Sequence, residues 1–233
     1  MADGETIAYR SLWARVQRAA VAPLVTTSVP IGERCWQITS VQNEDALLDA
    51  AETLEHFPYG FLLWEAAVGL ARMLTAKPEL VVGKRVLELG AGVGVPGIVA
   101  RHLGAEVWQT DHQPATIALS QLNALQNQVE GVQYFLADWR NWLHTERYEV
   151  LLGADILYAR PMHFHLERIF RQNLSPGGRL LLSDPVRPQA MEFVAHLEKA
   201  GWKLTLETEK VVLPESDKQD KPVEVALLIG KWE

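Results

Sequence analysis

The sequence VLELGAGVGV, residues 86–95, places the carboxylate of Glu88 two positions ahead of three alternating glycines. The preceding apolar run RVLELG (85–90) predicts a strand, and the following VPGIVARHLG (95–104) predicts a helix that starts near Pro96. A glycine-rich turn between a strand and a helix is where open α/β sheets bind their ligands. This stretch therefore predicts a cofactor site.

The pattern of the turn excludes the two common phosphate-binding motifs. A dinucleotide fingerprint, G-x-G-x-x-G, would need a third glycine where Val95 stands. A phosphate-binding loop would need a lysine after Gly97, but Ile98 and Val99 follow. Because the carboxylate of Glu88 would also repel phosphates in a partly desolvated crevice, we expect a ligand that carries a positive charge.

From residue 84 onward, short apolar runs alternate with amphipathic stretches, which is typical of a mainly parallel sheet covered by helices. Further strands are predicted at 106–111, 132–138, 148–155, 179–184, 202–213 and 223–232. Further helices are predicted at 113–127, 162–174 and 188–201. The segment SPGG (175–178) predicts a turn. The charged segment 214–222 predicts a solvated loop, so the last two strands are expected to pair antiparallel.

The first 55 residues carry no known motif. The N-terminal region predicts helices at 9–20 and 43–57 and strands at 23–32 and 35–41. We divide the chain into residues 1–57, a small N-terminal α+β extension that packs on the core, and residues 58–233, the cofactor-binding domain. A lid over a substrate pocket and a purely structural hairpin are both compatible with this extension.

The composition is that of a globular protein, with 48% hydrophobic and 22% charged residues among 233. The net charge of −7 argues against the basic surface that nucleic-acid binding needs, and it suits a cationic substrate. No apolar run approaches the roughly 20 residues that span a bilayer. The single cysteine, Cys35, cannot form an internal disulfide and is expected to be a buried hydrophobic side chain. We expect a cytoplasmic monomer that binds neither nucleic acid nor membrane.

The stretch ELGAGVG resembles the first motif, E/D-x-G-x-G-x-G, of the class I, seven-strand S-adenosylmethionine-dependent methyltransferases. The cofactor of that family carries the positive charge expected above. The resemblance implies cofactor contacts from the residues of this motif, which are Glu88, Gly90, Ala91, Gly92 and Gly94. It also implies an α/β, Rossmann-like fold: a seven-stranded, mostly parallel sheet with an antiparallel last strand and helices on both faces. A tight turn that needs glycine only for positive φ is the alternative.

Three further residues resemble cofactor contacts of the same family. Asp111, at the end of the predicted strand 106–111, matches the acid that accepts hydrogen bonds from the two ribose hydroxyls. A helix cap near Pro114 is the alternative for this residue. Asp138 matches the acid that takes the exocyclic amine of adenine, and Trp139 matches the side chain that packs on the base.

The stretch GADILY (153–158) narrows the resemblance to methyltransferase family 16, a branch that includes protein-lysine methyltransferases. Asp155 and Tyr158 match its [DE]-x-x-[YF] pattern, and Ala154 precedes them as an implied cofactor contact. The resemblance implies catalytic roles for both. We expect Asp155 to orient a lysine amine while it loses its proton, and Tyr158 to line the acceptor channel.

An upstream stretch, FPYGFLLWEAAVGLARML (57–74), is similar to the P-Y-x-x-x-x-W-P-x-A segment of that branch. It aligns Trp64 with the family tryptophan, which implies a cofactor contact. Glu65 replaces the proline that follows the tryptophan, and Gly60 replaces an aromatic residue. The alternative is that this stretch is a buried amphipathic helix. The two roles are compatible, because one face of such a helix could still touch the cofactor.

Together the motifs imply an S-adenosylmethionine-dependent methyltransferase that N-methylates a protein lysine. Two alternatives stay open: a small-molecule N-methyltransferase, and a non-catalytic S-adenosylmethionine-binding scaffold. A narrow channel beside Asp155 and Tyr158 would favour a lysine of a folded protein, whereas a closed pocket would favour a small amine. No metal is expected, because His163 and His165 would point to different faces of a helix.

Overall fold

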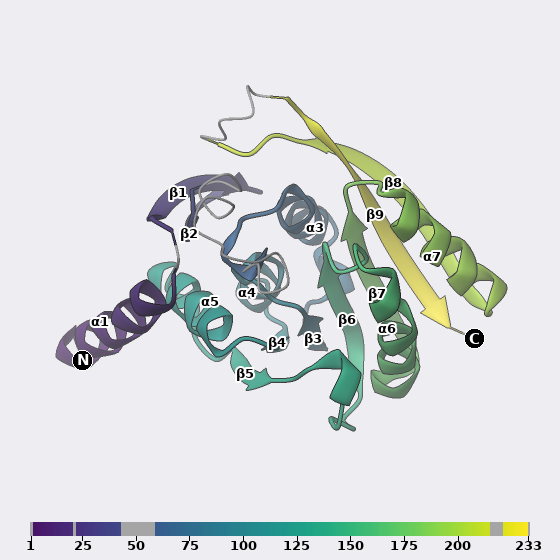
Figure 1. The fold of residues 1–233 in the computed structure, drawn as a ribbon, viewed down its shortest axis with the longest axis horizontal. Coiled ribbons are helices and arrows are strands. Elements are labelled where there is room, and N and C mark those ends of the chain that lie inside the picture. Colours follow the sequence, from purple (N-terminus) through teal and green to yellow (C-terminus); the bar gives the residue numbers. More distant parts are fainter. Residues whose placement is uncertain (1, 21, 43–58, 215–220, 233) are drawn as a thin grey trace.

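The computed structural model describes residues 2–20, 22–42, 59–214 and 221–232 (Figure 1). The strands of its main sheet are β3 (Arg85–Leu89), β4 (Glu106–Asp111), β5 (Gln133–Leu136), β6 (Tyr148–Ala154), β7 (Leu174–Asp184), β8 (Trp202–Val211) and β9 (Val223–Trp232). They are ordered β5-β4-β3-β6-β7-β9-β8. The first five run parallel and β9 pairs antiparallel with β7 and β8, which confirms the expected fold class.

Helices cover both faces of this sheet (Figure 1). They are α3 (Glu65–Ala76), α4 (Val95–His102), α5 (Pro114–Gln126), α6 (Arg160–Asn173) and α7 (Pro188–Lys199). A further helix, α1 (Ala2–Ala19), packs on α5, and the short 3-10 turns are η2 (Tyr59–Phe61), η3 (Pro78–Leu80) and η4 (Trp139–Asn141). The helix expected at 43–57 and most of the loop at 214–222 lie outside the described residues.

The strands bury alternate side chains in two separate cores. Val86 and Val150 pack in a cluster with side chains of α3 and α4. Leu87 and Leu151 point the other way, into a cluster with side chains of α6 and α7. Since successive side chains of a strand face opposite sides, two buried faces explain the nearly continuous apolar runs in the sequence.

One predicted turn is wrong. The segment 175–178, expected as a turn before a strand, is part of β7. Tyr148 pairs with Leu174 and Val150 pairs with Arg179, so the extra residues of β7 bulge between these two pairs.

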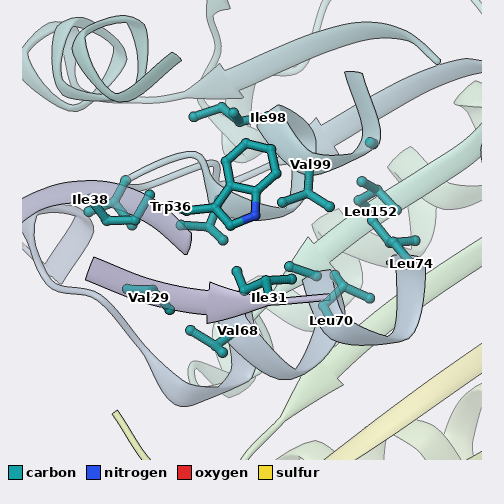
Figure 2. Close-up of a cluster of buried hydrophobic side chains, with 14 of the residues drawn as sticks. Val29, Ile31, Trp36, Ile38, Val68, Leu70, Leu74, Ile98, Val99 and Leu152 are labelled. Carbon is teal, nitrogen blue, oxygen red and sulfur yellow. The ribbon is translucent and has the colours of Figure 1, made fainter. Parts of the chain in front are cut away.

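A two-stranded hairpin from the N-terminal region shares the first core. Strands β1 (Leu24–Ile31) and β2 (Arg34–Val41) pair antiparallel, as expected from the sequence. Their inward side chains pack against α3 and α4 (Figure 2); they include Val29, Ile31, Trp36 and Ile38. The helix α1 packs along α5.

Two asparagines of α5 and of its C-terminal end hold the free edge of β2. The amide of Asn123 accepts from Thr39 N (2.8 Å) and donates to Thr39 O (3.0 Å). The amide of Asn127 does the same with Gln37 N (2.9 Å) and Gln37 O (2.8 Å). These side chains satisfy backbone groups that a neighbouring strand would otherwise satisfy.

Cys35 is exposed, which corrects its expected burial. It directly precedes Trp36, whose side chain faces the core, and neighbouring side chains of a strand face opposite sides. In the described part of the chain, no helix combines the length and apolar character needed to cross a bilayer.

Candidate active site

The turn after β3 adopts a backbone conformation that favours glycine. Gly90, Gly92 and Gly94 have φ values of 63°, 55° and 87°, in the left-handed region. A Cβ on Gly94 would also overlap Ser120 Oγ of α5. The alternating glycines are therefore required by the turn, whatever ligand it holds.

Glu88 holds this turn from inside the protein. Its carboxylate is 1% exposed, and Oε2 accepts from Gly97 N (3.1 Å) and Gln109 Nε2 (2.5 Å). Gln109 also donates to Gly94 O (2.8 Å) and accepts from Ser120 Oγ (2.7 Å). This network joins β3 and β4 to the first turn of α4. Gln109 was not expected as a site residue, although a polar residue inside a buried strand was a visible signal.

The charge expected of Glu88 is corrected by its surroundings. Burial raises the pKa of Glu88 to about 8, against the hydrogen bonds from Gln109 and Gly97, which lower it. Most of this carboxyl group is therefore protonated at neutral pH. Glu88 thus holds the turn through its hydrogen bonds to Gly97 and Gln109.

The raised pKa of Glu88 predicts a pH dependence of stability. Between about pH 4.5 and pH 8 the folded protein holds a proton that the unfolded chain has lost, so this group makes the free energy of unfolding fall as pH rises. Glu88→Gln keeps an acceptor oxygen and cannot ionise, so we expect the variant to lack this part of the decline. Urea unfolding of both proteins between about pH 5 and pH 9 measures the difference.

Glu192→Gln is the matched control, because the carboxylate of Glu192 is exposed. In this variant the free energy of unfolding should fall with pH as it does in wild type. A difference between wild type and Glu88→Gln that stays constant over the pH series would contradict the assigned protonation of Glu88.

Asp111, the last residue of β4, lies against the glycine turn. Its Oδ2 accepts from Gly92 N (3.2 Å), and its Oδ1 accepts from Gln113 N (3.1 Å) at the start of α5. His112 Nδ1 lies 3.2 Å from Oδ1, and the hydrogen bond to Asp111 raises the pKa of His112. The carboxylate therefore braces both the glycine turn and Gln113, the residue before the first turn of α5.

Asp138 and Trp139 follow β5 at the same edge of the sheet. Asp138 accepts from Arg140 N (2.9 Å), and both of its oxygens also accept from the Arg140 guanidinium. That hydrogen bond lowers the pKa of Asp138. Trp139 lies beside the turn, because a Cβ on Gly90 would stand 3.0 Å from the ring atom Cζ2. Trp139 is thus near the turn, while Asp138 is already engaged by Arg140.

The segment before α3 lies over the glycine turn. A Cβ on Gly92 would stand 3.5 Å from Gly60 O, and one on Gly60 would stand 2.7 Å from Thr116 Cγ2. A larger side chain at Gly60 would therefore displace Thr116. The replacement of proline by Glu65 also has a reason, since an acid in the first turn of α3 favours the helix dipole.

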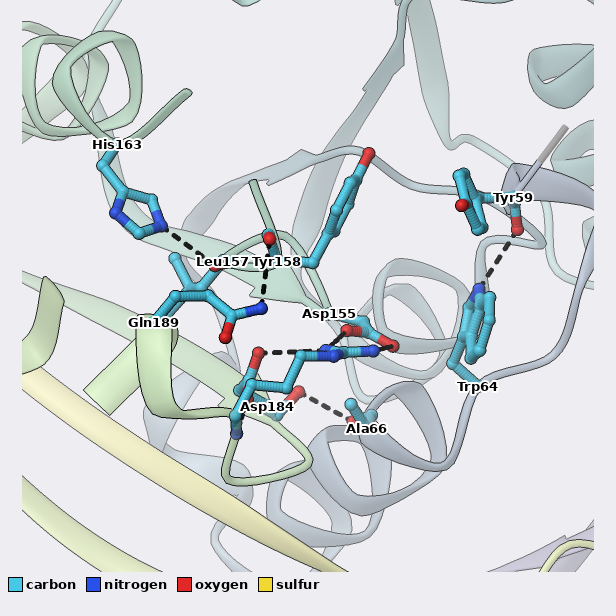
Figure 3. Close-up of polar contacts among 11 residues, drawn as sticks. Tyr59, Trp64, Ala66, Asp155, Leu157, Tyr158, His163, Asp184 and Gln189 are labelled. Carbon is cyan, nitrogen blue, oxygen red and sulfur yellow. Dashed lines mark hydrogen bonds and ion pairs between the residues drawn. The ribbon is translucent and has the colours of Figure 1, made fainter. Parts of the chain in front are cut away.

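Three aromatic rings stand near one another at this edge (Figure 3). Trp64, the N-cap residue of α3, donates from Nε1 to Tyr59 O (3.1 Å). The Tyr59 ring centroid lies 6.3 Å from that of Trp64 and 5.8 Å from that of Tyr158. Burial raises the pKa of Tyr158, and the charges of Asp111 and Asp155 add to this, so its hydroxyl stays protonated.

Asp155 follows β6 and turns back toward the end of β7. Its φ is 57°, and its backbone N donates to Ser183 O (2.9 Å). Ala154, the last residue of β6, pairs with Ser183 in the sheet. The Asp155 carboxylate is paired with the Arg187 guanidinium, which also contacts Asp184 Oδ2 (3.1 Å). Arg187 was not expected from the sequence.

A family model for lysine methyltransferases matches residues 42–200, more than half of the chain. The chain belongs to the lysine methyltransferase family. The match to the family spans the glycine turn, Asp111 and the Asp155–Tyr158 stretch, and it ends just after α7.

Two methyltransferases from other organisms are similar to this chain over part of their length. The protein N-lysine methyltransferase METTL21A of Danio rerio is 41% identical over 127 residues, which cover 52% of this chain and 58% of that protein. The histone-arginine methyltransferase METTL23 of Rattus norvegicus is 32% identical over 109 residues, which cover 44% and 48%. The chain thus spans about half the length of these curated relatives.

The same fold occurs in solved methyltransferase structures. A ribosomal protein L11 methylase from Lactobacillus delbrueckii subsp. bulgaricus superimposes with a TM-score of 0.57 at 17% identity, covering 74% of this chain and 81% of that one. At this identity the likeness supports the fold alone.

Proposed function

We propose that this protein is an S-adenosylmethionine-dependent methyltransferase that methylates the side-chain amine of a protein lysine. The observation that carries the proposal is the meeting of the glycine turn, Asp111 and the Asp155–Tyr158 stretch at one edge of the sheet. Membership of the lysine methyltransferase family supports the reaction class. The name of the zebrafish relative supports lysine as the acceptor.

The residues at the turn fit this cofactor. The left-handed glycine turn and the Asp111 carboxylate beside it match the cofactor motif of the family, in which the turn would lie against the methionine part and the carboxylate would hold the ribose diol. The residues that would hold the cofactor are Trp64, Gly90, Ala91, Gly92, Gly94, Asp111, Asp138, Trp139 and Ala154, with Glu88 supporting the turn. Asp138 would share its carboxylate between Arg140 and the adenine amine. When bound, the cofactor supplies a methyl group activated by a sulfonium.

The acceptor side needs positioning more than acid or base chemistry. An amine attacks only with a free lone pair, and its alignment at the reacting distance can contribute several kcal/mol. The lysine ammonium releases its proton to solvent, and Asp155 accepts a hydrogen bond from the resulting amine and so orients it. Tyr158, half-exposed and protonated, lines the channel and offers a hydroxyl to the acceptor.

Calorimetric titration tests the cofactor assignment. Wild-type protein is expected to bind S-adenosylmethionine, and Asp111→Ala is expected to bind it about 10- to 100-fold more weakly, because a hydrogen bond to a charged group contributes about 1.5–3 kcal/mol. Glu192→Ala, at an exposed position, is the control and should bind S-adenosylmethionine with wild-type affinity. Absence of measurable binding to wild type would overturn the proposal.

Transfer of label tests the acceptor. Purified protein, labelled cofactor and a lysate of the same cells should give label in the protein fraction, on lysine. Label in small molecules would instead support the small-molecule N-methyltransferase, and label on arginine would match the named activity of the rat relative. Binding without any transfer would support the non-catalytic scaffold.

We also propose that the protein acts in the cytoplasm as a monomer, on neither nucleic acid nor membrane. The single cysteine and the net charge of −7 support this. An assembly much heavier than 26.1 kDa in size-exclusion chromatography, or enrichment with membranes or nucleic acid on cell fractionation, would contradict it.

A further inference from the structure

A cluster of three charged side chains lies where β6 and β7 end, beside the acceptor side of the site. Arg187 Nη1 donates to Asp155 Oδ1 and to Asp184 Oδ2 (3.1 Å), and Nη2 donates to Asp155 Oδ2 (3.3 Å). Both carboxylates are buried, whereas the Arg187 side chain is 28% exposed. Figure 3 shows Asp155 and Asp184 in the same region as Tyr158. One guanidinium therefore links the ends of two neighbouring strands.

The backbone on both sides of this cluster is held in an unusual conformation. Asp155 and Val186 have φ values of 57° and 58°, and a β-branched residue rarely adopts the left-handed region. Arg187 N donates to Asp184 Oδ1 (2.8 Å), which fixes the residue at the start of α7. Strained backbone of this kind persists only where its surroundings hold it, and it is concentrated at functional sites.

The Arg187 guanidinium contacts both oxygens of the Asp155 carboxylate and places a positive charge against it. A two-pronged contact fixes the plane of a carboxylate better than a single hydrogen bond does. An unpaired carboxylate would also favour the ammonium form of an approaching lysine, which has no lone pair to attack with. The guanidinium offsets that charge and leaves the carboxylate able to accept a hydrogen bond from an amine.

We propose that Arg187 is a positioning residue of the acceptor site, which fixes Asp155 and balances its charge so that a lysine amine is oriented in its neutral form. This inference rests on the proposed function. Asp184 serves the same purpose from the other side, since it anchors both the backbone and the guanidinium of Arg187.

Two substitutions of Arg187 test this role. Arg187→Gln is expected to lower kcat/KM for methyl transfer by about 100-fold, because a displacement of about 1 Å at a reacting group costs about that much. Arg187→Lys is expected to recover only part of this, because an ammonium cannot make the two-pronged contact. Affinity for S-adenosylmethionine, measured by calorimetry, should stay unchanged in both variants. This binding readout also shows that the variants are folded.

A double-mutant cycle separates positioning from a general structural role. If Arg187 acts through Asp155, the double variant Asp155→Asn/Arg187→Gln should be no less active than Asp155→Asn alone. The matched control is Arg72→Gln, because the Arg72 side chain is also 28% exposed and pairs with Glu209 (3.0 Å) away from the site. It should keep wild-type kcat/KM.

Each outcome decides between the two proposals. Wild-type protein that binds no S-adenosylmethionine would overturn the proposed function, and this inference with it. If wild type is active and Arg187→Gln is equally active, this inference is wrong while the proposed function stands. The same follows if the losses of the two single variants add up in the double variant. If Arg187→Gln does not fold, the partial loss expected of Arg187→Lys with unchanged cofactor affinity carries the test.

Discussion

Asp155→Asn is expected to lower kcat for methyl transfer by about 1,000-fold, because the acceptor amine loses its alignment, while affinity for S-adenosylmethionine stays unchanged. Asparagine has the size of aspartate but presents an NH2 donor in place of one oxygen. The new NH2 group would face one of the two N–H donors of Arg187, and two donors cannot form a hydrogen bond. The asparagine side chain would therefore rotate away from the plane that Asp155 has now. The acceptor amine would lose both its alignment and the group that accepts its hydrogen bond.

Single-turnover kinetics with labelled cofactor measure this loss apart from product release. Glu209→Gln exchanges carboxylate for amide in the ion pair with Arg72 and should keep the wild-type rate. Tyr158→Phe, followed in the same assay, should lose less, because it keeps the ring beside Tyr59. Transfer by Asp155→Asn at the wild-type rate would remove Asp155 and Arg187 from the acceptor site.

The position of the site could be predicted because parallel strands end at one edge of a sheet. The strand 106–111 was predicted with the bounds that β4 has, so Asp111 had to lie beside the turn after the neighbouring strand. The same reasoning brought Asp155 to this edge, after β6. Regular periodicity and a common strand direction are properties that a local sequence carries.

The role of Glu88 could not be predicted because the motif indicates where the residue lies but not which way it faces. In β3, Glu88 faces the same side of the sheet as the buried Val86, under α4. There its carboxyl group accepts hydrogen bonds from Gln109 and from the backbone of Gly97. The period of two in a strand places Glu88 on the buried face. A buried acid then changes its protonation rather than stay charged.

Arg187 could not be predicted because its contact depends on long-range geometry. It lies 32 positions after Asp155, and no sequence pattern joins the two. The contact exists because β6 and β7 are neighbours and because Val186 takes a left-handed conformation that a sequence does not favour.

Trp36→Ala is expected to lower the free energy of unfolding by about 3–5 kcal/mol, the usual cost of deleting a buried aromatic side chain. Trp36 is 1% exposed in the core that β2 shares with α3 and α4 (Figure 2). Its ring stands perpendicular to that of His102 at 5.3 Å, and the Arg34 guanidinium lies 4.5 Å from its centre. Removing it opens a cavity between the hairpin and the main sheet.

This variant also tests how the two parts of the chain fold. We propose that residue 57 marks a change in sequence pattern rather than a boundary of folding, since the hairpin and the residues after 58 bury their side chains in one core. Urea unfolding followed by tryptophan fluorescence and by circular dichroism should therefore give one coincident transition, displaced in Trp36→Ala to lower urea. Trp232→Ala, at a 42% exposed site, should cost much less. Two separate transitions in wild type, or a loss in Trp36→Ala no larger than in Trp232→Ala, would mean that the hairpin folds apart from the sheet.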